Sequence, residues 1–116
     1  MTSTLFILND APYGNERAYN ALRLAGALAG KDNQEIRIFL MADAISCAKA
    51  GQKVPEGYYN VQLMLGKVLR HGQVALCGTC MDARGMTEAE IVPGAKRSTL
   101  AELADWTAAA DKVLVY

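Results

Sequence analysis

Short apolar runs alternate with longer segments of helical periodicity along this chain, and that alternation restricts the fold more than any other feature of the sequence. Four runs have the length and the apolar content of β-strands: residues 4–8, 36–41, 73–77 and 112–116. Strands that are apolar on both faces belong to parallel sheets covered by helices on each side. We therefore predict an α/β fold, a three-layer sandwich in which a mainly parallel sheet of about five strands is flanked by helices.

Helices are expected between these strands. Apolar residues recur at helical spacing over residues 15–29 and 59–70, and Gly30 is expected to close the first of these helices in the C′ position. Asp43 is a natural N-cap for a short helix over residues 44–50. Successive strands are thus joined by helical segments, as parallel pairing requires.

The last third of the chain contains one clear helix and one segment with a weak pattern. Thr99 and Glu102 have the spacing of a capping box, which would open a helix that runs to about residue 110. Residues 85–97 show no strong periodicity, and they allow a short helix after Thr87 and a short strand near Ala95. That strand would complete a sheet of five.

Length and charge limit the classes of protein to consider. The chain has 116 residues, enough for one hydrophobic core, so we expect a single domain over residues 1–116. Its twelve Lys and Arg residues balance twelve Asp and Glu residues, and no stretch gathers basic residues into a stripe. Nucleic acid is therefore not expected as a partner.

The N-terminal residues, MTSTLFILND, have neither the basic region nor the long apolar run of a signal peptide. No segment approaches the roughly 20 apolar residues that span a bilayer. We expect a cytoplasmic protein without a membrane partner. In that compartment the three cysteines, Cys47, Cys77 and Cys80, should be thiols unless they do redox work.

The segment QVALCGTCMDARG, residues 73–85, places Cys77 and Cys80 where the third predicted strand ends. In open parallel sheets, ligands bind beyond the carboxyl ends of the strands. The same edge should hold the loops after the first three predicted strands: residues 9–14, 42–43 and 77–82. The CxxC segment therefore lies where a protein of this class keeps its working site. Its two thiols can make a disulfide, hold a metal, pass on a sulfur atom or simply fill space.

A metal site has little support in the sequence. A closed zinc site needs four ligands, and beyond the CxxC the chain offers only Cys47, His71 and some carboxylates. There is no second CxxC and no HxxxH, and His71 is explained as a cation at a helix C-terminus. Cys47 lies among small residues in a predicted helix, which favours core packing. We expect neither a metal nor another cofactor.

Two chemical roles and one structural role remain open for Cys77 and Cys80. A CxxC between a strand and a helix is the arrangement of thiol–disulfide oxidoreductases, although here it comes two thirds of the way along the chain. Alternatively, Cys77 is a nucleophile that carries sulfur as a persulfide, with Arg84 as the nearest cation in sequence and Cys80 as a resolving or receiving thiol. In the structural alternative, both cysteines are small buried residues.

The order and spacing of several segments together resemble the DsrE/DsrF-like sulfur-relay family, in particular its small single-domain YchN-like branch. The resemblance covers essentially the whole chain, through the segments NDAPYGNERAYNALRLAGAL, RIFLMADAI, GQKVPEGYYNVQLML, LCGTCMDARG and TLAELADWTAAADKVLVY. In sulfur-relay members, a persulfide-carrying Cys is followed, after a short helical segment, by Arg-Gly. Counting back from Arg84 and Gly85, the matching residue is Cys77. Members usually have an Ala-rich, Arg-containing helix after that Cys, whereas this chain has GTCMDARG, with Cys80 as an added thiol.

The resemblance implies a sulfurtransferase-like carrier that holds sulfur on Cys77, with Cys80 as a resolving or receiving thiol. Its partners would be a protein sulfur donor or acceptor, and it would form a homo-oligomer, a trimer or a hexamer, with the cysteines near subunit boundaries. The predicted substrate-binding residues around the cysteines are Asn9, Asp10, Tyr13, Gly14, Asp43, Asp82 and Arg84. The alternatives are a thiol–disulfide redox protein that uses Cys77 and Cys80, and a non-catalytic, small-ligand-binding oligomer with inert cysteines.

Overall fold

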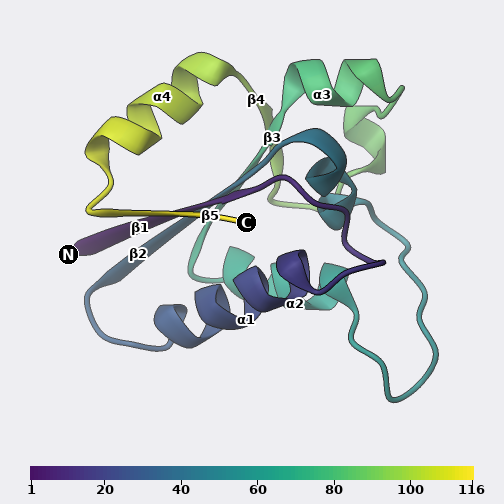
Figure 1. Cartoon of the computed structure of the whole chain (residues 1–116), viewed down its shortest axis with the longest axis horizontal. Coiled ribbons are helices and arrows are strands. Elements are labelled where there is room, and N and C mark those ends of the chain that lie inside the picture. The colour runs from purple at the N-terminus through teal and green to yellow at the C-terminus, as the bar shows by residue number, and fades with distance from the viewer.

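Five strands form one sheet in the computed structural model, which describes residues 1–116 (Figure 1). The strands are β1 (Thr2–Leu8), β2 (Gln34–Leu40), β3 (Gly72–Cys77), β4 (Lys96–Ser98) and β5 (Lys112–Val115). They lie in the order β4-β3-β2-β1-β5, and all four pairings are parallel. The prediction of a mainly parallel sheet of about five strands is confirmed, and the sheet is parallel throughout.

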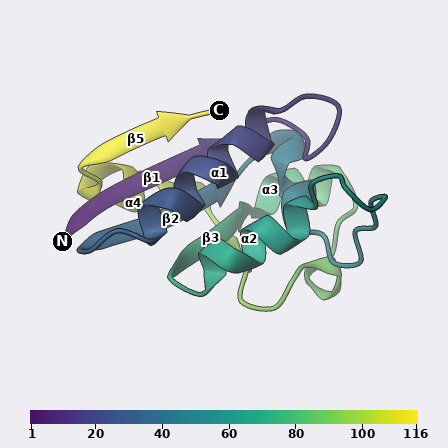
Figure 2. The same ribbon diagram turned by 90° about the horizontal axis from the view of Figure 1, so that it is seen from below.

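Helices cover both faces of this sheet. They are α1 (Arg17–Ala29), η1 (Ala42–Ala48), α2 (Val61–Leu69), α3 (Gly78–Ala83), η2 (Glu88–Glu90) and α4 (Leu100–Ala109), where η marks a 3₁₀ helix. Figure 1 shows α1 and α2 below the sheet and α3 and α4 above it. Figure 2 shows α1 and α2 lying side by side along the face that they share. The three-layer sandwich expected from the sequence is therefore confirmed.

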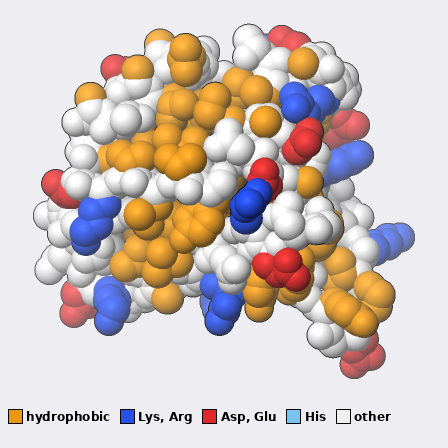
Figure 3. All heavy atoms as spheres, in the orientation of Figure 1, with side chains coloured by type: hydrophobic (Ala, Val, Ile, Leu, Met, Phe, Trp, Pro, Cys, Tyr) orange, Lys and Arg blue, Asp and Glu red, His pale blue; other side chains and the backbone are white.

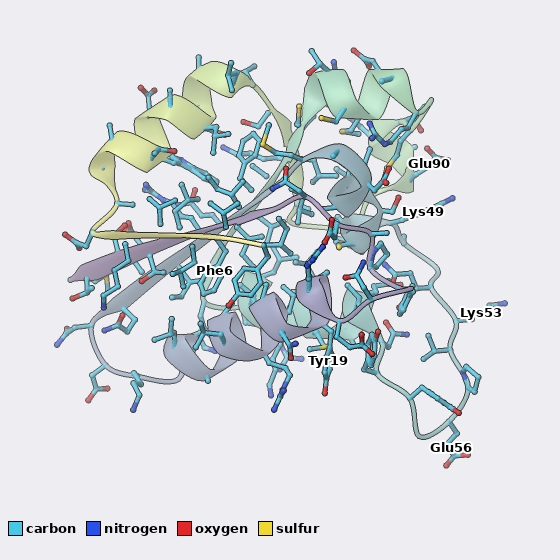
Figure 4. All side chains as sticks on the ribbon, in the orientation of Figure 1. Phe6, Tyr19, Lys49, Lys53, Glu56 and Glu90 are labelled. Atoms are coloured by element: carbon cyan, nitrogen blue, oxygen red, sulfur yellow. The ribbon has the colours of Figure 1, made fainter.

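Alternation of side chains along the strands divides the core in two. Phe6, Ile38 and Leu76 point to the face covered by α1 and α2, where Phe6 lies between the sheet and α1 (Figure 4). The other face holds a smaller cluster, which contains Leu5, Phe39, Ala75, Cys77, Leu103 and Trp106. Because successive strand residues point to opposite faces, Cys77 belongs to the α4 side of the sheet.

Two local predictions are wrong. Asp43 does not cap a helix, because the segment winds as the 3₁₀ helix η1 with Met41 at the N-cap position and no side-chain cap bond. Gly30 does close α1, as expected, but at the C-cap position rather than at C′, since its φ is −80°. The chain turns three residues later, where Asn33 has a φ of 58°.

The weak segment before α4 contains both of the elements that the sequence allowed. The short 3₁₀ helix η2 follows Thr87, and β4 begins at Lys96. Thr99 caps α4, since its hydroxyl accepts the Glu102 N–H at 3.2 Å. The other half of the predicted box is absent because the Glu102 carboxylate accepts the Ser98 hydroxyl at 2.6 Å instead.

Residues 84–95 carry the chain from α3 to the edge strand β4. Val92 is buried with the core of the α1 and α2 face, and its N–H donates to the Ala48 carbonyl at 2.8 Å. A bridge between Lys49 and Ile91 joins the same two segments. The end of η1 and the segment after α3 thus support each other beneath the carboxyl edge of the sheet. None of the helices is both long and apolar enough to cross a membrane.

Candidate functional site

The third strand passes directly into α3, and Cys77 lies at this junction. No loop separates β3, which ends at Cys77, from α3, which begins at Gly78. Cys77 occupies the N-cap position of α3, and its sulfur accepts the Cys80 N–H at 3.4 Å. The Thr79 hydroxyl lies 3.2 Å from the same sulfur. The thiol therefore takes the place of the oxygen that usually caps a helix, with only 8% of the residue exposed.

The second cysteine of the motif faces the loop that follows β2. The Cys80 sulfur accepts the Ala42 N–H at 3.2 Å. Ala42 has a φ of 49°, a left-handed conformation that costs energy for a residue with a Cβ atom. Arg84 strengthens the same contact, because its guanidinium bonds the Cys80 carbonyl at 3.3 Å and the Asp43 carboxylate at 3.0 Å. The edge contact predicted between the loop after β2 and the CxxC segment is thus present.

The environments of the two thiols push their pKa values apart. Burial raises the pKa of the Cys77 thiol, but hydrogen bonds from Cys80 and Thr79 outweigh that effect and hold it below the ordinary thiol value. Burial also raises the pKa of Cys80, and its hydrogen bond to Cys77 raises it further, against the opposing effect of the Ala42 N–H. Cys77 is therefore the thiol that ionises first, with Cys80 as its protonated neighbour.

The third cysteine is placed as the sequence predicted, in the core. Cys47 is fully buried in the cluster on the α1 and α2 face. Burial raises the pKa of its thiol to about 12. A thiol that stays protonated and has no access to solvent is unreactive, so Cys47 takes no part in the site.

A cavity of about 180 Å³ opens beside Cys77, and Arg97 forms one of its walls. The cavity is lined by Cys77, Gly78, Thr79, Arg97, Ser98, Thr99 and Leu100. The Arg97 guanidinium makes two bonds of 2.8 Å to the Asp82 carboxylate. This pairing lowers the pKa of Asp82, so the carboxylate stays charged. The predicted site residue Asp82 is thus joined to the cavity through Arg97.

Sequence reasoning missed two residues of this site. Thr79 follows Cys77 by two positions. A hydroxyl so close in sequence could have been recognised as a hydrogen-bond partner of the sulfur. Arg97 had no such signal, because it comes from the segment with the weak pattern. Its place beside the cysteines depends on the pairing of Leu76 with Arg97 and of Cys77 with Ser98.

The four predicted residues of the first loop contact other parts of the molecule. The Asn9 backbone and side chain both donate to the Tyr116 carbonyl, and Asp10 pairs with Arg17 at 2.9 Å. The Tyr13 hydroxyl donates to the Gln52 side chain at 2.6 Å. Gly14 supplies a turn with a φ of 103°. These contacts lead to β5, to α1 and to the loop after η1 rather than to either cysteine.

The loop after η1 extends outward from the carboxyl edge. Figure 4 shows Lys53 and Glu56 at its outer end, whereas Lys49 and Glu90 lie closer to the sheet. In the molecule as a whole, no group of three or more His, Cys, Asp or Glu side chains is arranged to hold a metal ion. The cysteine pair with its cavity is therefore the cluster of reactive side chains at this edge.

Comparison with known proteins identifies relatives of this chain. The model of the DsrE/DsrF-like family matches residues 2–116. The YchN protein of Escherichia coli strain K12 is 44% identical over 118 residues, with both chains covered completely. An uncharacterized protein of Methanocaldococcus jannaschii is 34% identical over 110 residues, which cover 95% of this chain and 96% of the relative.

Solved structures support the same comparison. The crystal structure of the YchN protein from Escherichia coli superposes with a TM-score of 0.94 at 44% identity, over the full length of both chains. A protein of unknown function from Methanobacterium thermoautotrophicum superposes with a TM-score of 0.76 at 10% identity, also over both full lengths. The second likeness is one of fold alone.

Proposed function

Because this chain belongs to the DsrE/DsrF-like family, which is associated with sulfur relay, we propose that it carries sulfane sulfur as a persulfide on Cys77. The observation that carries the proposal is the hydrogen bonding of the Cys77 sulfur, which the Cys80 N–H and the Thr79 hydroxyl both contact. These contacts favour the thiolate, and the thiolate is the form that attacks sulfur.

The transfer needs only thiol chemistry. The Cys77 thiolate attacks the outer sulfur of a donor persulfide, a new S–S bond forms at Cys77, and the donor leaves as a thiolate. An acceptor thiolate then attacks the outer sulfur on Cys77, takes it as a new persulfide and releases the Cys77 thiolate. No net oxidation occurs, so neither step needs a cofactor. Both steps need reduced cysteines, the state that the cytoplasm maintains, and we propose that compartment.

A second function, thiol–disulfide exchange by Cys77 and Cys80, is favoured by one contact. The Cys77 sulfur accepts the Cys80 N–H at 3.4 Å, so the two cysteines are neighbours at the start of α3. The Cys80 thiolate could attack the inner sulfur of a Cys77 persulfide, which would form a Cys77–Cys80 disulfide and release hydrosulfide. A thiol reductant would then have to restore the pair. In the carrier, Cys80 would instead accept the outer sulfur.

Intact-mass measurement separates these functions. The purified protein and its Cys77→Ser, Cys80→Ser and Cys47→Ser variants are incubated with a low-molecular-weight persulfide and measured with and without reductant. The carrier predicts a gain of one sulfur that reductant removes, that is absent in Cys77→Ser and that persists in Cys80→Ser. Cys47→Ser is the matched control and should load like the unaltered chain, because Cys47 is buried away from the site.

The other outcomes would each contradict the carrier. A loss of two hydrogens that requires both Cys77 and Cys80 would favour the redox pair. No change in any chain would leave a small-ligand-binding oligomer with inert cysteines. If the Cys77→Ser variant still gained sulfur, a residue other than Cys77 would be the carrier.

A further inference from the structure

We propose that Arg97 is the specificity residue of the Cys77 cavity and that the small molecule which delivers sulfur to Cys77 or removes it carries a negative charge. This inference rests on the proposed sulfur chemistry of Cys77, because it concerns which reactants reach that thiol. It does not depend on the direction in which the sulfur moves.

The composition of the cavity wall is the first observation. Its residues provide one cation, Arg97, and the hydroxyl groups of Thr79 and Thr99, and no carboxylate lines it. The third hydroxyl of the wall, that of Ser98, already donates to Glu102. The Thr99 oxygen accepts a backbone N–H, which leaves its own proton free to be donated. A wall with a cation and hydroxyl donors, but without acidic groups, suits an anion.

The geometry of the ion pair is the second observation. Arg97 uses its two terminal nitrogens for Asp82, so the pair is formed end-on. Its Nε lies 2.9 Å from the position that a Cβ atom would take at Gly78. The Nε–H makes no hydrogen bond within the protein and remains available beside the cavity. Asp82 therefore orients the guanidinium without using its Nε–H.

The position and size of the cavity are the third observation. A volume of about 180 Å³ corresponds to roughly six water molecules at about 30 Å³ each, so the cavity admits a molecule of a few heavy atoms. It also lies against Thr99 and Leu100 at the start of α4, where helix N–H groups favour negative charge. A small sulfur-bearing anion, such as a persulfide anion or a thiosulfonate, has this size and charge.

Arg97 also depends on Gly78 for its place. A Cβ atom at residue 78 would meet the Arg97 Nε and the Ser98 carbonyl oxygen, each at 2.9 Å. Contacts of that length are not tolerated, so a side chain at residue 78 would displace the guanidinium and would also strain the backbone at Ser98. Gly78→Ala therefore offers a second way to displace the cation without changing its charge.

The test compares two alkylating reagents of similar size at Cys77. Iodoacetate is an anion and iodoacetamide is neutral, and both form a thioether with the thiolate and release iodide. The rates are measured in the Cys80→Ser background, so that Cys77 is the reactive thiol. Any change in the fraction of thiolate alters both rates equally, so the ratio of the two rates reports only on charge recognition.

We expect Arg97→Gln to lower the iodoacetate-to-iodoacetamide ratio by about three- to tenfold, the effect of removing one nearby charge from a partly exposed site. Arg97→Lys should keep part of the ratio, and added salt should reduce it in the parent but not in Arg97→Gln. The matched control is Lys96→Gln, which removes a neighbouring charge of β4 that lies outside the cavity and pairs with Glu102. Its ratio should stay unchanged.

Two further measurements keep the test decisive if Arg97→Gln does not fold. Gly78→Ala should lower the ratio in the same direction, and unfolding the parent in urea, with Cys47 also replaced by serine so that Cys77 is the remaining thiol, should also lower it. An unchanged ratio in Arg97→Gln, or an equal fall in Lys96→Gln, would overturn the inference. If sulfur still loads on Cys77 while the ratio is unchanged, only the role of Arg97 fails. If the ratio falls but no sulfur loads, the anion site stands and the carrier function fails.

Discussion

At the scale of single residues, the Cys77 thiol depends on two neighbours that the turn from strand to helix brings to it. The Cys80 N–H approaches because residue 77 holds the N-cap position, and the Thr79 hydroxyl approaches because its residue begins the same turn. Both contacts stabilise negative charge on the sulfur. Only the hydroxyl can be removed by substitution without changing the backbone.

Thr79→Val should raise the pKa of Cys77. In the folded protein that pKa is lowered, so the thiolate is populated at a lower pH than in an ordinary thiol. Removing the hydroxyl leaves burial less opposed, and the midpoint of the rate of reaction with iodoacetamide should move to higher pH. The measurement is a pH profile of that rate in the Cys80→Ser background.

Thr107→Val is the control for that substitution, because the Thr107 hydroxyl bonds the Leu103 carbonyl within α4 and lies away from the cavity. Its midpoint should match that of the parent. A midpoint that stays in place or falls in Thr79→Val would mean that the hydroxyl does not stabilise the thiolate.

The sequence was informative about residues only where the signal was local. Cys77 and Cys80 could be selected because the CxxC spacing and the end of an apolar strand are both visible in one short segment. Arg97 could not be selected, because its position depends on the register between β3 and β4. The 18 residues from 78 to 95 separate the end of β3 at Cys77 from the start of β4 at Lys96. Non-local register of this kind is set by packing rather than by any single stretch.

At the scale of elements, the loop after η1 is organised by one amide side chain. Gln52 donates to the Cys47 carbonyl at 3.0 Å and to the Lys49 carbonyl at 2.9 Å, and it accepts the Tyr13 hydroxyl. The Tyr13 oxygen in turn accepts the Val61 N–H at 3.1 Å, at the start of α2. The first loop, η1 and α2 are therefore joined through a single pair of side chains.

Tyr13→Phe and Gln52→Ala should each lower the free energy of unfolding by about 1–3 kcal/mol, because each leaves a partner without its hydrogen bond. The two effects should add only in part, since both remove the Tyr13–Gln52 hydrogen bond while each also removes bonds of its own. Denaturant unfolding of the two single variants and the double variant measures the coupling. Tyr58→Phe is the control, because that side chain is exposed and its loss should change little.

The same variants decide what Tyr13 does. The sequence predicted Tyr13 as a substrate-binding residue, and its contacts are those of a residue that holds the loop together. If Tyr13→Phe lost sulfur loading while its stability stayed unchanged, the substrate-binding role would be the correct one. A loss of stability with normal loading would leave Tyr13 as a structural residue.

Elements with a strong period were predicted well, and elements set by tertiary contacts were not. The strands other than β4, together with α1, α2 and α4, follow from hydrophobic patterns that are visible within each segment. Asp43 was expected at a helix cap because its residue type favours caps, but a guanidinium from another segment, that of Arg84, pairs with it instead. Local preference was overridden by a contact between segments that are 41 residues apart.

At the scale of the whole molecule, an edge of the sheet remains exposed. Val113 and Val115 of β5 lie in register with Leu5 and Ile7, on the α4 side, and Val115 is 65% exposed. Figure 3 shows hydrophobic side chains gathered between α4 and β5. An exposed strand edge next to apolar side chains favours pairing with another chain. We propose a second copy of this chain as the partner, in the trimer or hexamer that the family resemblance implies.

Val115→Lys should weaken that association, because a charge at the contact would have to be buried without a partner. Sedimentation velocity of the two chains at equal concentration measures the change. The control is Leu63→Lys on α2, where the side chain is 71% exposed on the opposite face of the sheet. If Val115→Lys sediments as the parent does while Leu63→Lys dissociates, the contact lies on the α2 side instead.

The direct passage from β3 into α3 has a consequence for how sulfur would be transferred. A carrier that holds its chemical group on a long flexible arm can move that group between several active sites. Cys77 has no such arm, since its backbone belongs to a strand on one side and to a helix on the other. A sulfur bound to Cys77 would therefore stay at one fixed position at the edge of the sheet. In the sulfur relay that we propose, donor and acceptor would therefore have to bind at this edge one after the other, and their binding and release would limit the rate of transfer.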